Sequence, residues 1–303
     1  MNNQFTRRRF LKQTGTVAAA AAFAPCIPLS SPLWGAEDTP GSKMKLGMVT
    51  YLWGKDWDLP TLIANCERAG LGGVETRVDH KHGVGPALTA SERLEVKKMF
   101  ADSPVELLGP GTNECFDSPD PDRVRQCIEN AKAFLKLSHD CGGTGVKVKP
   151  NSLHDGVPQE VTTAQIAKSL DEVGTYAGEY GQKVRVEVHG SCCPLPIMKE
   201  IIDQVESPHV GLCWNCNGQD LDGKGLEHNF NLVKDRFADT VHIRELNSGD
   251  YPYQELMNLF VGMDYEGWIL FENRTSPPDL VEAYIEQREL FETMVAEAME
   301  KGV

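Results

Sequence analysis

Short apolar runs alternate with longer amphipathic segments along most of the chain. The runs have the length and the valine and isoleucine content of β-strands, and the segments between them repeat apolar residues at helical spacing. The expected strands are Lys45–Leu52, Gly73–Val78, Val105–Gly109, Val146–Lys149, Val184–His189, Val210–Trp214, Thr240–Leu246 and Trp268–Glu272. The expected helices include Thr89–Phe100, Asp122–Leu137, Thr163–Tyr180, Pro196–Val205, Leu226–Phe237, Tyr253–Phe260 and Pro278–Met299. Eight strand–helix pairs in succession predict one α/β domain, a closed (β/α)8 TIM barrel.

Alternation within each run assigns its side chains to the barrel interior or to the surrounding helices. In Val184–His189 the valines face the helices, so Arg185, Glu187 and His189 point inward. The same pattern directs further residues inward: Glu75, Arg77, Asp79, Lys147, Lys149, His242, Arg244, Glu272 and Arg274. Barrel interiors are normally filled by branched apolar side chains, so this charge near the strand ends indicates an active site there.

Four residues that can bind a metal ion follow four successive strands. Glu187, Asn215, His242 and Glu272 are separated by 28, 27 and 30 residues, close to the length of one strand and one helix. Because the carboxyl ends of parallel strands meet at one rim, we expect the four side chains to converge. Two carboxylates, an amide oxygen and an imidazole suit Mn²⁺, Mg²⁺ or Co²⁺, and they are also compatible with Zn²⁺.

The first 36 residues have the organisation of an export signal. The segment Thr6-Arg7-Arg8-Arg9-Phe10-Leu11-Lys12 precedes an alanine-rich apolar stretch, which predicts a twin-arginine signal at 1–36, a linker at 37–43 and the barrel at 44–303. A basic helix retained in the cytoplasm is the alternative. We expect a periplasmic protein, tethered to the membrane if the signal is not cleaved. No later run is long enough to span a bilayer.

The charge of the chain argues against several classes of partner. Beyond residue 36 the chain has 26 Lys and Arg against 44 Asp and Glu, which gives a net charge of −18. Such a surface repels nucleic acid and anionic lipid. The C-x-x-C formed by Cys213 and Cys216 is compatible with a redox or zinc motif. Because Cys213 falls inside an expected strand and no second Cys or His pair accompanies it, we interpret both as buried structural thiols.

At the four candidate ligands the chain resembles the xylose-isomerase-like sugar phosphate isomerase/epimerase superfamily. The resemblance extends over 45–299, nearly the whole expected barrel. Members of this superfamily carry Glu, Asp, His and Glu on strands five to eight as metal ligands, and the two glutamates act as acid and base. Glu187, His242 and Glu272 match this pattern by residue type and by strand.

The match is incomplete at strand six. Asn215 stands where Asp is usual, and Gly218 stands where many members have a His. With Asn215 the ligand set has one negative charge fewer, which implies that a metal ion binds more weakly and is a stronger Lewis acid. The alternative is that the site holds no metal. The segment 214–217 and the signal together resemble an exported subgroup of the superfamily.

The resemblance implies a metal-dependent isomerase or epimerase that removes a proton beside a carbonyl of a sugar or keto-sugar through an enediolate. Glu187 and Glu272 would act on opposite faces of the substrate, with His189 as an additional acid or base. One alternative is a keto-sugar or glycoside lyase or hydratase, since the same proton abstraction drives elimination. Another is a non-catalytic carbohydrate-binding barrel, which Asn215 motivates. A DNA-repair endonuclease, the activity of another branch of the superfamily, is disfavoured by the acidic chain and the signal.

The remaining polar residues near the rim are candidate contacts for a small-molecule carbohydrate. They are Glu75, Lys147, Lys149, Asn217, Arg244 and Trp53. The cations can bind an anionic or polarised oxygen, the glutamate can bind hydroxyls and the indole can stack on a sugar ring. Ion pairs with the interior glutamates, and an aromatic plug at the barrel mouth, are the competing interpretations. We expect no nucleic-acid partner, and a homo-oligomer is compatible with the sequence.

Overall fold

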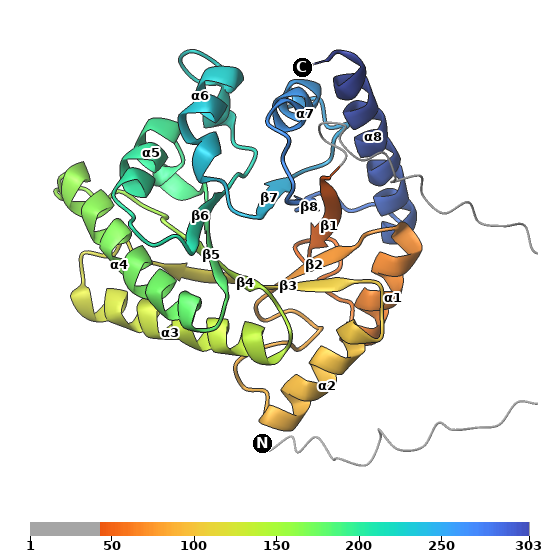
Figure 1. Ribbon diagram of the computed structural model, residues 1–303, viewed down its shortest axis with the longest axis horizontal. Coiled ribbons are helices and arrows are strands. Elements are labelled where there is room, and N and C mark those ends of the chain that lie inside the picture. Colours follow the sequence, from red (N-terminus) through yellow and green to blue (C-terminus); the bar gives the residue numbers. More distant parts are fainter. Residues whose placement is uncertain (1–42, 303) are drawn as a thin grey trace, which may run out of the picture. The chain divides into compact units, whose positions relative to one another are not determined.

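Eight parallel strands form the wall of a barrel that helices surround in the computed structural model, which describes residues 43–302 (Figure 1). The strands are β1 Lys45–Val49, β2 Gly73–Arg77, β3 Glu106–Cys115, β4 Gly145–Lys149, β5 Lys183–Glu187, β6 Val210–Cys213, β7 Thr240–Ile243 and β8 Trp268–Phe271. This confirms the expected TIM barrel. The expected signal at 1–36, and the linker at 37–43 except Lys43, lie outside the described residues.

The barrel is nearly closed, and β6 and β7 meet where the continuous ladder ends. The strand order is β6-β5-β4-β3-β2-β1-β8-β7. Two isolated parallel bridges, Leu212–Phe237 and Asn215–His242, join the two ends of this sheet. The His242 amide donates to the Trp214 carbonyl over 2.7 Å. The join therefore brings two of the expected metal ligands side by side.

Helices cover the outside of the barrel and follow the strands in alternation (Figure 1). The α-helices are α1 Leu59–Ala69, α2 Ala90–Ala101, α3 Pro121–Asp140, α4 Gln159–Glu179, α5 Leu195–Asp203, α6 Leu226–Val233, α7 Tyr253–Gly262 and α8 Leu280–Glu300. Local sequence fixes several of their starts: Asp58 caps α1, and Thr89 with Glu92 forms a reciprocal capping box on α2. Within 43–302, no helix has the length and apolar character needed to cross a membrane.

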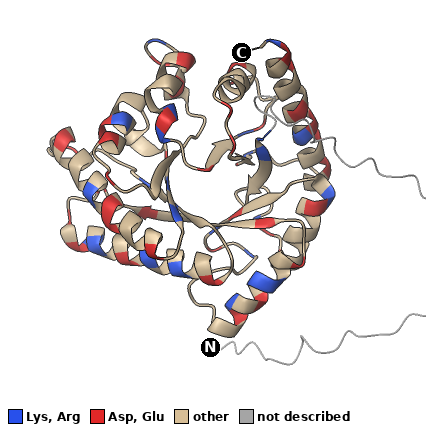
Figure 2. Ribbon diagram, viewed as in Figure 1, with Lys and Arg blue, Asp and Glu red and all other residues tan. Residues whose placement is uncertain are grey.

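The two faces of the strands are packed as the alternating pattern predicts. Val184, Val186 and Val188 on β5 and just beyond it are fully buried against the helices. Burying a valine side chain contributes about 1.5–3 kcal/mol, so each strand is anchored by its outer face. Figure 2 shows charged residues of both signs along the outer helices and a smaller number on the strands.

An ion pair fills the interior near the amino-terminal end of the strands. Arg185 is fully buried and binds Asp239 through two hydrogen bonds of 2.8 and 3.0 Å. Its Nη1 donates to the Leu108 carbonyl over 2.7 Å, and its Nη2, which also binds Asp239, donates to the Thr144 hydroxyl over 2.6 Å. A buried guanidinium with all these partners satisfied belongs to the floor of the barrel rather than to a reactive site.

β3 is the strand that differs most from its prediction. It continues to Cys115, whereas the sequence predicts an end at Gly109. Pro110 and Gly111 favour a turn in isolation, but register shifts on both sides of β3 accommodate them within the sheet. The extension places residues 112–115 at the barrel mouth.

Candidate active site

The carboxyl ends of β5 to β8 bring the four expected metal ligands together. Glu187 ends β5, Asn215 lies two residues beyond β6, His242 is within β7 and Glu272 directly follows β8. All four are buried, with at most 4% of their surface exposed. Ligand atoms of the two glutamates and the histidine lie within 4.8 Å of one another. The predicted convergence is therefore present in the structure.

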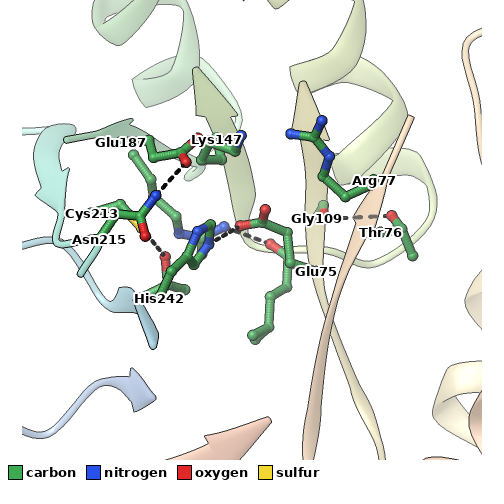
Figure 3. A network of polar contacts seen from close by, with 12 residues as sticks. Glu75, Thr76, Arg77, Gly109, Lys147, Glu187, Cys213, Asn215 and His242 are labelled. Atoms are coloured by element: carbon green, nitrogen blue, oxygen red, sulfur yellow. Dashed lines mark hydrogen bonds and ion pairs between the residues drawn. The ribbon is translucent and has the colours of Figure 1, made fainter. Parts of the chain in front are cut away.

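Glu187 is held by a donor at each of its two oxygen atoms (Figure 3). Lys147 Nζ lies 2.5 Å from Oε2, and Asn215 Nδ2 donates to Oε1 over 2.8 Å. Burial acts to raise the pKa of Glu187, but Lys147 and His242 outweigh it and lower that pKa. Glu187 is thus an anion in the folded protein. For Lys147, which is fully buried, the structure shows the ion pair that the sequence left as an alternative to a substrate contact.

His242 forms a second pair with Glu75 across the interior (Figure 3). Its Nε2 lies 3.2 Å from Glu75 Oε2. Burial opposes protonation of the ring, but Cys213 and Glu75 raise the pKa of His242 well above its usual value. Conversely, burial opposes ionisation of Glu75, and His242 lowers the pKa of that carboxyl. The pair couples β2 to β7 through the centre of the barrel.

Glu272 has the opposite electrostatic environment to Glu187. Burial raises the pKa of Glu272, and the neighbouring charge of Glu187 raises it further. Two nearby carboxyl groups whose environments move their pKa values apart form a donor and an acceptor for protons. This arrangement places a carboxyl group that favours the ionised form beside one that holds its proton to higher pH.

The residues present fit a divalent metal ion. Asn215 Oδ1, His242 Nδ1 and Glu75 Oε1 are buried without a hydrogen-bond partner. Each Glu187 oxygen accepts one hydrogen bond from a neighbouring side chain, and a carboxylate oxygen has lone pairs for two. Unpartnered oxygen and nitrogen atoms beside a three-residue ligand cluster match the donor set of Mn²⁺, Mg²⁺, Co²⁺ or Zn²⁺.

Three other expected contacts lie at the mouth of the barrel. Lys149 is half-buried, and burial together with the neighbouring Lys147 lowers its pKa. His189 is half-buried, with Nδ1 placed 3.2 Å from Asn151 Oδ1. Arg244 is half-buried, and its Nε has no hydrogen-bond partner. Within residues 43–302 none of the three forms an ion pair, and in this they differ from Lys147.

Two expected contacts are engaged in holding the rim. Asn217 Nδ2 donates to the carbonyls of Val188 and Asn215, both at 2.8 Å, and so ties the end of β5 to the end of β6. The Trp53 ring is 2% exposed, donates to the Thr275 carbonyl over 2.9 Å and packs edge-on against a tyrosine of α8. Trp53 thus has the position of the aromatic plug, and stacking on a sugar would require this ring to move.

Two residues expected to face the interior do not. Asp79 and Arg274 are exposed, because the chain leaves the strand before each of them. Asp79 has a φ of 63°, which reverses the direction that the alternation predicts. Asn113, in contrast, was not among the candidates and accepts hydrogen bonds from Arg77 and Lys149. It lies on the unexpected extension of β3, and its polar character directly after Pro110-Gly111-Thr112 is the only signal that the sequence offers.

The cysteines of the C-x-x-C are buried. Cys213 Sγ contacts the Trp214 carbonyl and Cys216 Sγ contacts the His242 carbonyl, at 3.7 and 3.6 Å. Burial raises the pKa of both thiols. The eight cysteines within residues 43–302 are all free. These observations agree with structural thiols at positions 213 and 216.

Two surface hollows lie at the other end of the barrel. They have volumes of about 410 and 440 Å³ and are lined by residues from the amino-terminal ends of the strands, among them Lys183 and Glu106. The convergent carboxylates and imidazole lie at the carboxyl ends. Active sites of TIM barrels are built at that end, so we place the candidate site there and not in the hollows.

Comparisons with known proteins agree with this geometry. Among solved structures, L-ribulose 3-epimerase is similar with a TM-score of 0.74 and 16% identity, over 86% of this chain and 97% of that one. The 3-keto-D-glucoside 4-epimerase from E. coli is similar with a TM-score of 0.67 and 16% identity, over 83% of this chain and 100% of that one. The IolI protein with a bound zinc atom is similar with a TM-score of 0.67 and 15% identity, over 85% of this chain and 99% of that one.

At these identities the solved structures establish a common fold. No curated protein matches the sequence. The family model described as xylose isomerase-like TIM barrel matches residues 63–294, which is most of the chain. The protein therefore belongs to the xylose isomerase-like TIM barrel family.

Proposed function

We propose that the protein is a sugar isomerase or epimerase that moves a proton at a carbon beside a carbonyl group. The observation that carries this proposal is the buried pair of Glu187 and Glu272, whose pKa values are shifted in opposite directions. The similar solved structures include epimerases named for ribulose, allulose and a 3-keto-glucoside, which supports a carbohydrate substrate.

The two carboxyl groups divide the proton transfer between them. Glu187, whose pKa is lowered, accepts the proton from the substrate carbon, and Glu272, whose pKa is raised, donates one. Donation to the opposite face of the same carbon inverts its configuration, and donation to the adjacent carbon exchanges aldose and ketose. Lys147 and Asn215 fix the orientation of Glu187 through its two oxygens. His189, two residues beyond Glu187, is the proposed additional acid or base.

A divalent ion is the cofactor that this donor set fits. Glu187, His242 and Glu272 would hold it, with Asn215 Oδ1 as a fourth ligand. When bound, such an ion polarises the carbonyl oxygen of a substrate and lowers the pKa of the neighbouring C–H. With Asn in place of Asp, the site has one negative charge fewer to attract the ion.

Solvent exchange tests the proposed reaction. The full protein, supplied with Mn²⁺, is incubated in D₂O with free ketoses and 3-keto-glycosides, and deuterium incorporation is followed by NMR. Deuterium at one carbon with a change of configuration indicates an epimerase, and loss of a substituent indicates a lyase or hydratase. Absence of exchange in every sugar, with measurable binding, would support the non-catalytic barrel.

We also propose export through the amino-terminal segment. The support is the order of its basic, Phe-Leu-Lys and alanine-rich parts. Replacing Arg7 and Arg8 together by Lys keeps the charge but removes the arginine pair, so we expect the protein to remain in the cytoplasm. Unchanged recovery from the periplasmic fraction would contradict this.

A further inference from the structure

Two cations stand at the mouth of the barrel, beyond the buried carboxylates. Arg77 is the last residue of β2 and Lys149 is the last residue of β4. Each lies two positions beyond an interior residue of its strand, Glu75 and Lys147 respectively. Alternate residues of a strand share a face, so both side chains lie on the interior side, one layer nearer the solvent. Figure 3 shows Arg77 on the same strand as Glu75, beside the interior network.

These two cations share a single neutral acceptor. Arg77 Nη2 and Lys149 Nζ donate to the same atom, Asn113 Oδ1, over 3.1 and 3.3 Å. Within residues 43–302, neither cation forms an ion pair. The Nε atom of Arg77 is buried and has no partner. A buried donor without a partner is costly, and two positive charges around one amide oxygen repel each other.

The strand between them has a glycine at the aligned position. Gly111 on β3 is aligned with Arg77 on one side and with Lys147 on the other. A Cβ atom at Gly111 would lie 2.3 Å from Glu75 Oε1 and 3.2 Å from Arg77 Cδ. Any larger residue would therefore displace these two side chains. The glycine therefore lets the Glu75 and Arg77 side chains pack directly against the backbone of β3.

Most charges below the mouth are paired among themselves. Glu75 is paired with His242 and Glu187 with Lys147. Glu272 forms no ion pair within residues 43–302, and it is the interior carboxylate that faces both Arg77 and Lys149 electrostatically. The chain as a whole is acidic, with a net charge of −14. A local excess of positive charge at the entrance of an acidic protein attracts an anionic small molecule selectively.

We propose that Arg77, Lys149 and Asn113 form a subsite for an anionic group on the sugar, a carboxylate or a phosphate ester. This deepens the proposed function, on which the identity of the ligand as a sugar rests. A guanidinium can bind two oxygens of such a group, and the ammonium adds a further charge-assisted hydrogen bond. Asn113 is exposed, so its amide can rotate and present its NH₂ group to the anion. The substrate is then an acidic sugar.

Calorimetric titration of the full protein with three related sugars tests the subsite. D-glucuronate, D-glucose 6-phosphate and D-glucose differ at one carbon, so the anionic group is the main variable. We expect at least one anionic sugar to bind about tenfold to a hundredfold more tightly than glucose at low ionic strength. Added salt should reduce this preference. The anionic sugar that binds more tightly shows whether the subsite prefers a carboxylate or a phosphate ester. Equal affinities for all three sugars would overturn the proposal.

Asn113→Asp is the most informative variant. It places a carboxylate beside the same two cations and keeps their hydrogen bonds, so the fold is preserved while the anion has to compete with a fixed charge. We expect the preference for the anionic sugar to disappear. Arg77→Gln and Lys149→Met should each weaken anion binding about tenfold or more. Lys183→Met removes a cation at the opposite end of the barrel and should leave all three affinities unchanged.

Different experimental results would contradict the subsite and the proposed reaction. Tight binding of an anionic sugar without deuterium exchange in any sugar would contradict the reaction and keep the subsite. Exchange in neutral keto-sugars, with no preference for anions in the titrations, would contradict the subsite and keep the reaction. Wild-type affinity of the Asn113→Asp variant for the anionic sugar would also contradict the subsite.

Discussion

The side-chain amide of Asn215 donates a hydrogen bond to Glu187 Oε1 over 2.8 Å, at the point where β6 and β7 close the barrel. An aspartate at this position would have no hydrogen to donate and would place a second anion beside Glu187. Asparagine therefore removes a charge from the ligand set and also orients the carboxylate that remains.

Asn215→Asp should have opposite effects on the metal-free and the metal-bound protein. Loss of a hydrogen bond to a charged group costs about 1.5–3 kcal/mol, so we expect lower stability in the presence of a chelator. The added carboxylate should tighten Mn²⁺ binding, because divalent ions prefer anionic oxygen ligands. Urea unfolding with EDTA and calorimetric titration with Mn²⁺ measure the two effects. Unchanged Mn²⁺ affinity would mean that residue 215 is not a ligand.

The fold and the convergence of ligands were readable from the sequence because both depend on short-range patterns. A period of two within the strands and the spacing of one strand and one helix are sufficient to place Glu187, His242 and Glu272 at one rim. The sequence also predicted that Lys147 points inward. It could not choose between the ion pair and a substrate contact, because that choice depends on the distance between neighbouring strands.

The features that the sequence did not predict arise from exceptions to these patterns. Pro110 and Gly111 indicate a turn, yet β3 continues through them because shifts in register absorb the irregularity. Asn113 was missed for this reason. The exposure of Asp79 has a similar origin, since a positive φ at a non-glycine residue ends the alternation.

Lys147→Met should strongly destabilise the metal-free protein. Removing one partner of a buried ion pair leaves an uncompensated charge and costs about 3–5 kcal/mol. The Glu187 pKa is lowered by folding, so its stabilising contribution is present above the unfolded pKa and is lost as the pH falls through the folded value. The difference between wild type and variant should therefore be largest near neutral pH and shrink in acid.

The double variant Lys147→Met with Glu187→Gln is the control for this interpretation. It removes both charges, so most of the lost stability should return. Urea unfolding with EDTA from pH 3 to pH 8 follows both proteins. A double variant as unstable as the single one would show that the lysine acts through packing of its aliphatic chain and not through charge.

Glu272→Gln and Glu187→Gln should each abolish exchange of the substrate C–H with solvent. Glu187→Gln also leaves Lys147 without its partner, so this variant should be less stable, and its rate is measured under conditions where it is folded. General acid–base groups contribute about 10²- to 10⁴-fold to a rate, so exchange should fall by at least about a hundredfold. Deuterium incorporation measures the rate, and circular dichroism checks the fold. Glu300→Gln, at the end of α8 and far along the chain from the site, is the matched control and should exchange at the wild-type rate. Full activity of both site variants would remove these carboxyl groups from the mechanism.

Asp220 should make the stability of the protein depend on pH near neutrality. It lies behind the rim, where its Oδ2 accepts hydrogen bonds from the backbone N–H of Asn217 and from the Tyr251 hydroxyl, both at 2.8 Å. Its Oδ1 is buried without a partner. Burial raises its pKa from 3.8 to about 7, although the two hydrogen bonds oppose this. A carboxyl group whose pKa is raised by folding binds protons more tightly in the folded state.

The ionisation of Asp220 therefore costs stability as the pH rises from about 4 through about 7, and the cost is constant above that range. Asn at this position can still accept both hydrogen bonds and never ionises. We expect Asp220→Asn to be more stable than wild type at pH 8 and to lose this advantage at pH 4. Asp222→Asn, two residues further along and exposed, should show no such change between the two pH values. Thermal unfolding across this range measures the difference, and parallel curves for Asp220→Asn and wild type would contradict the assignment.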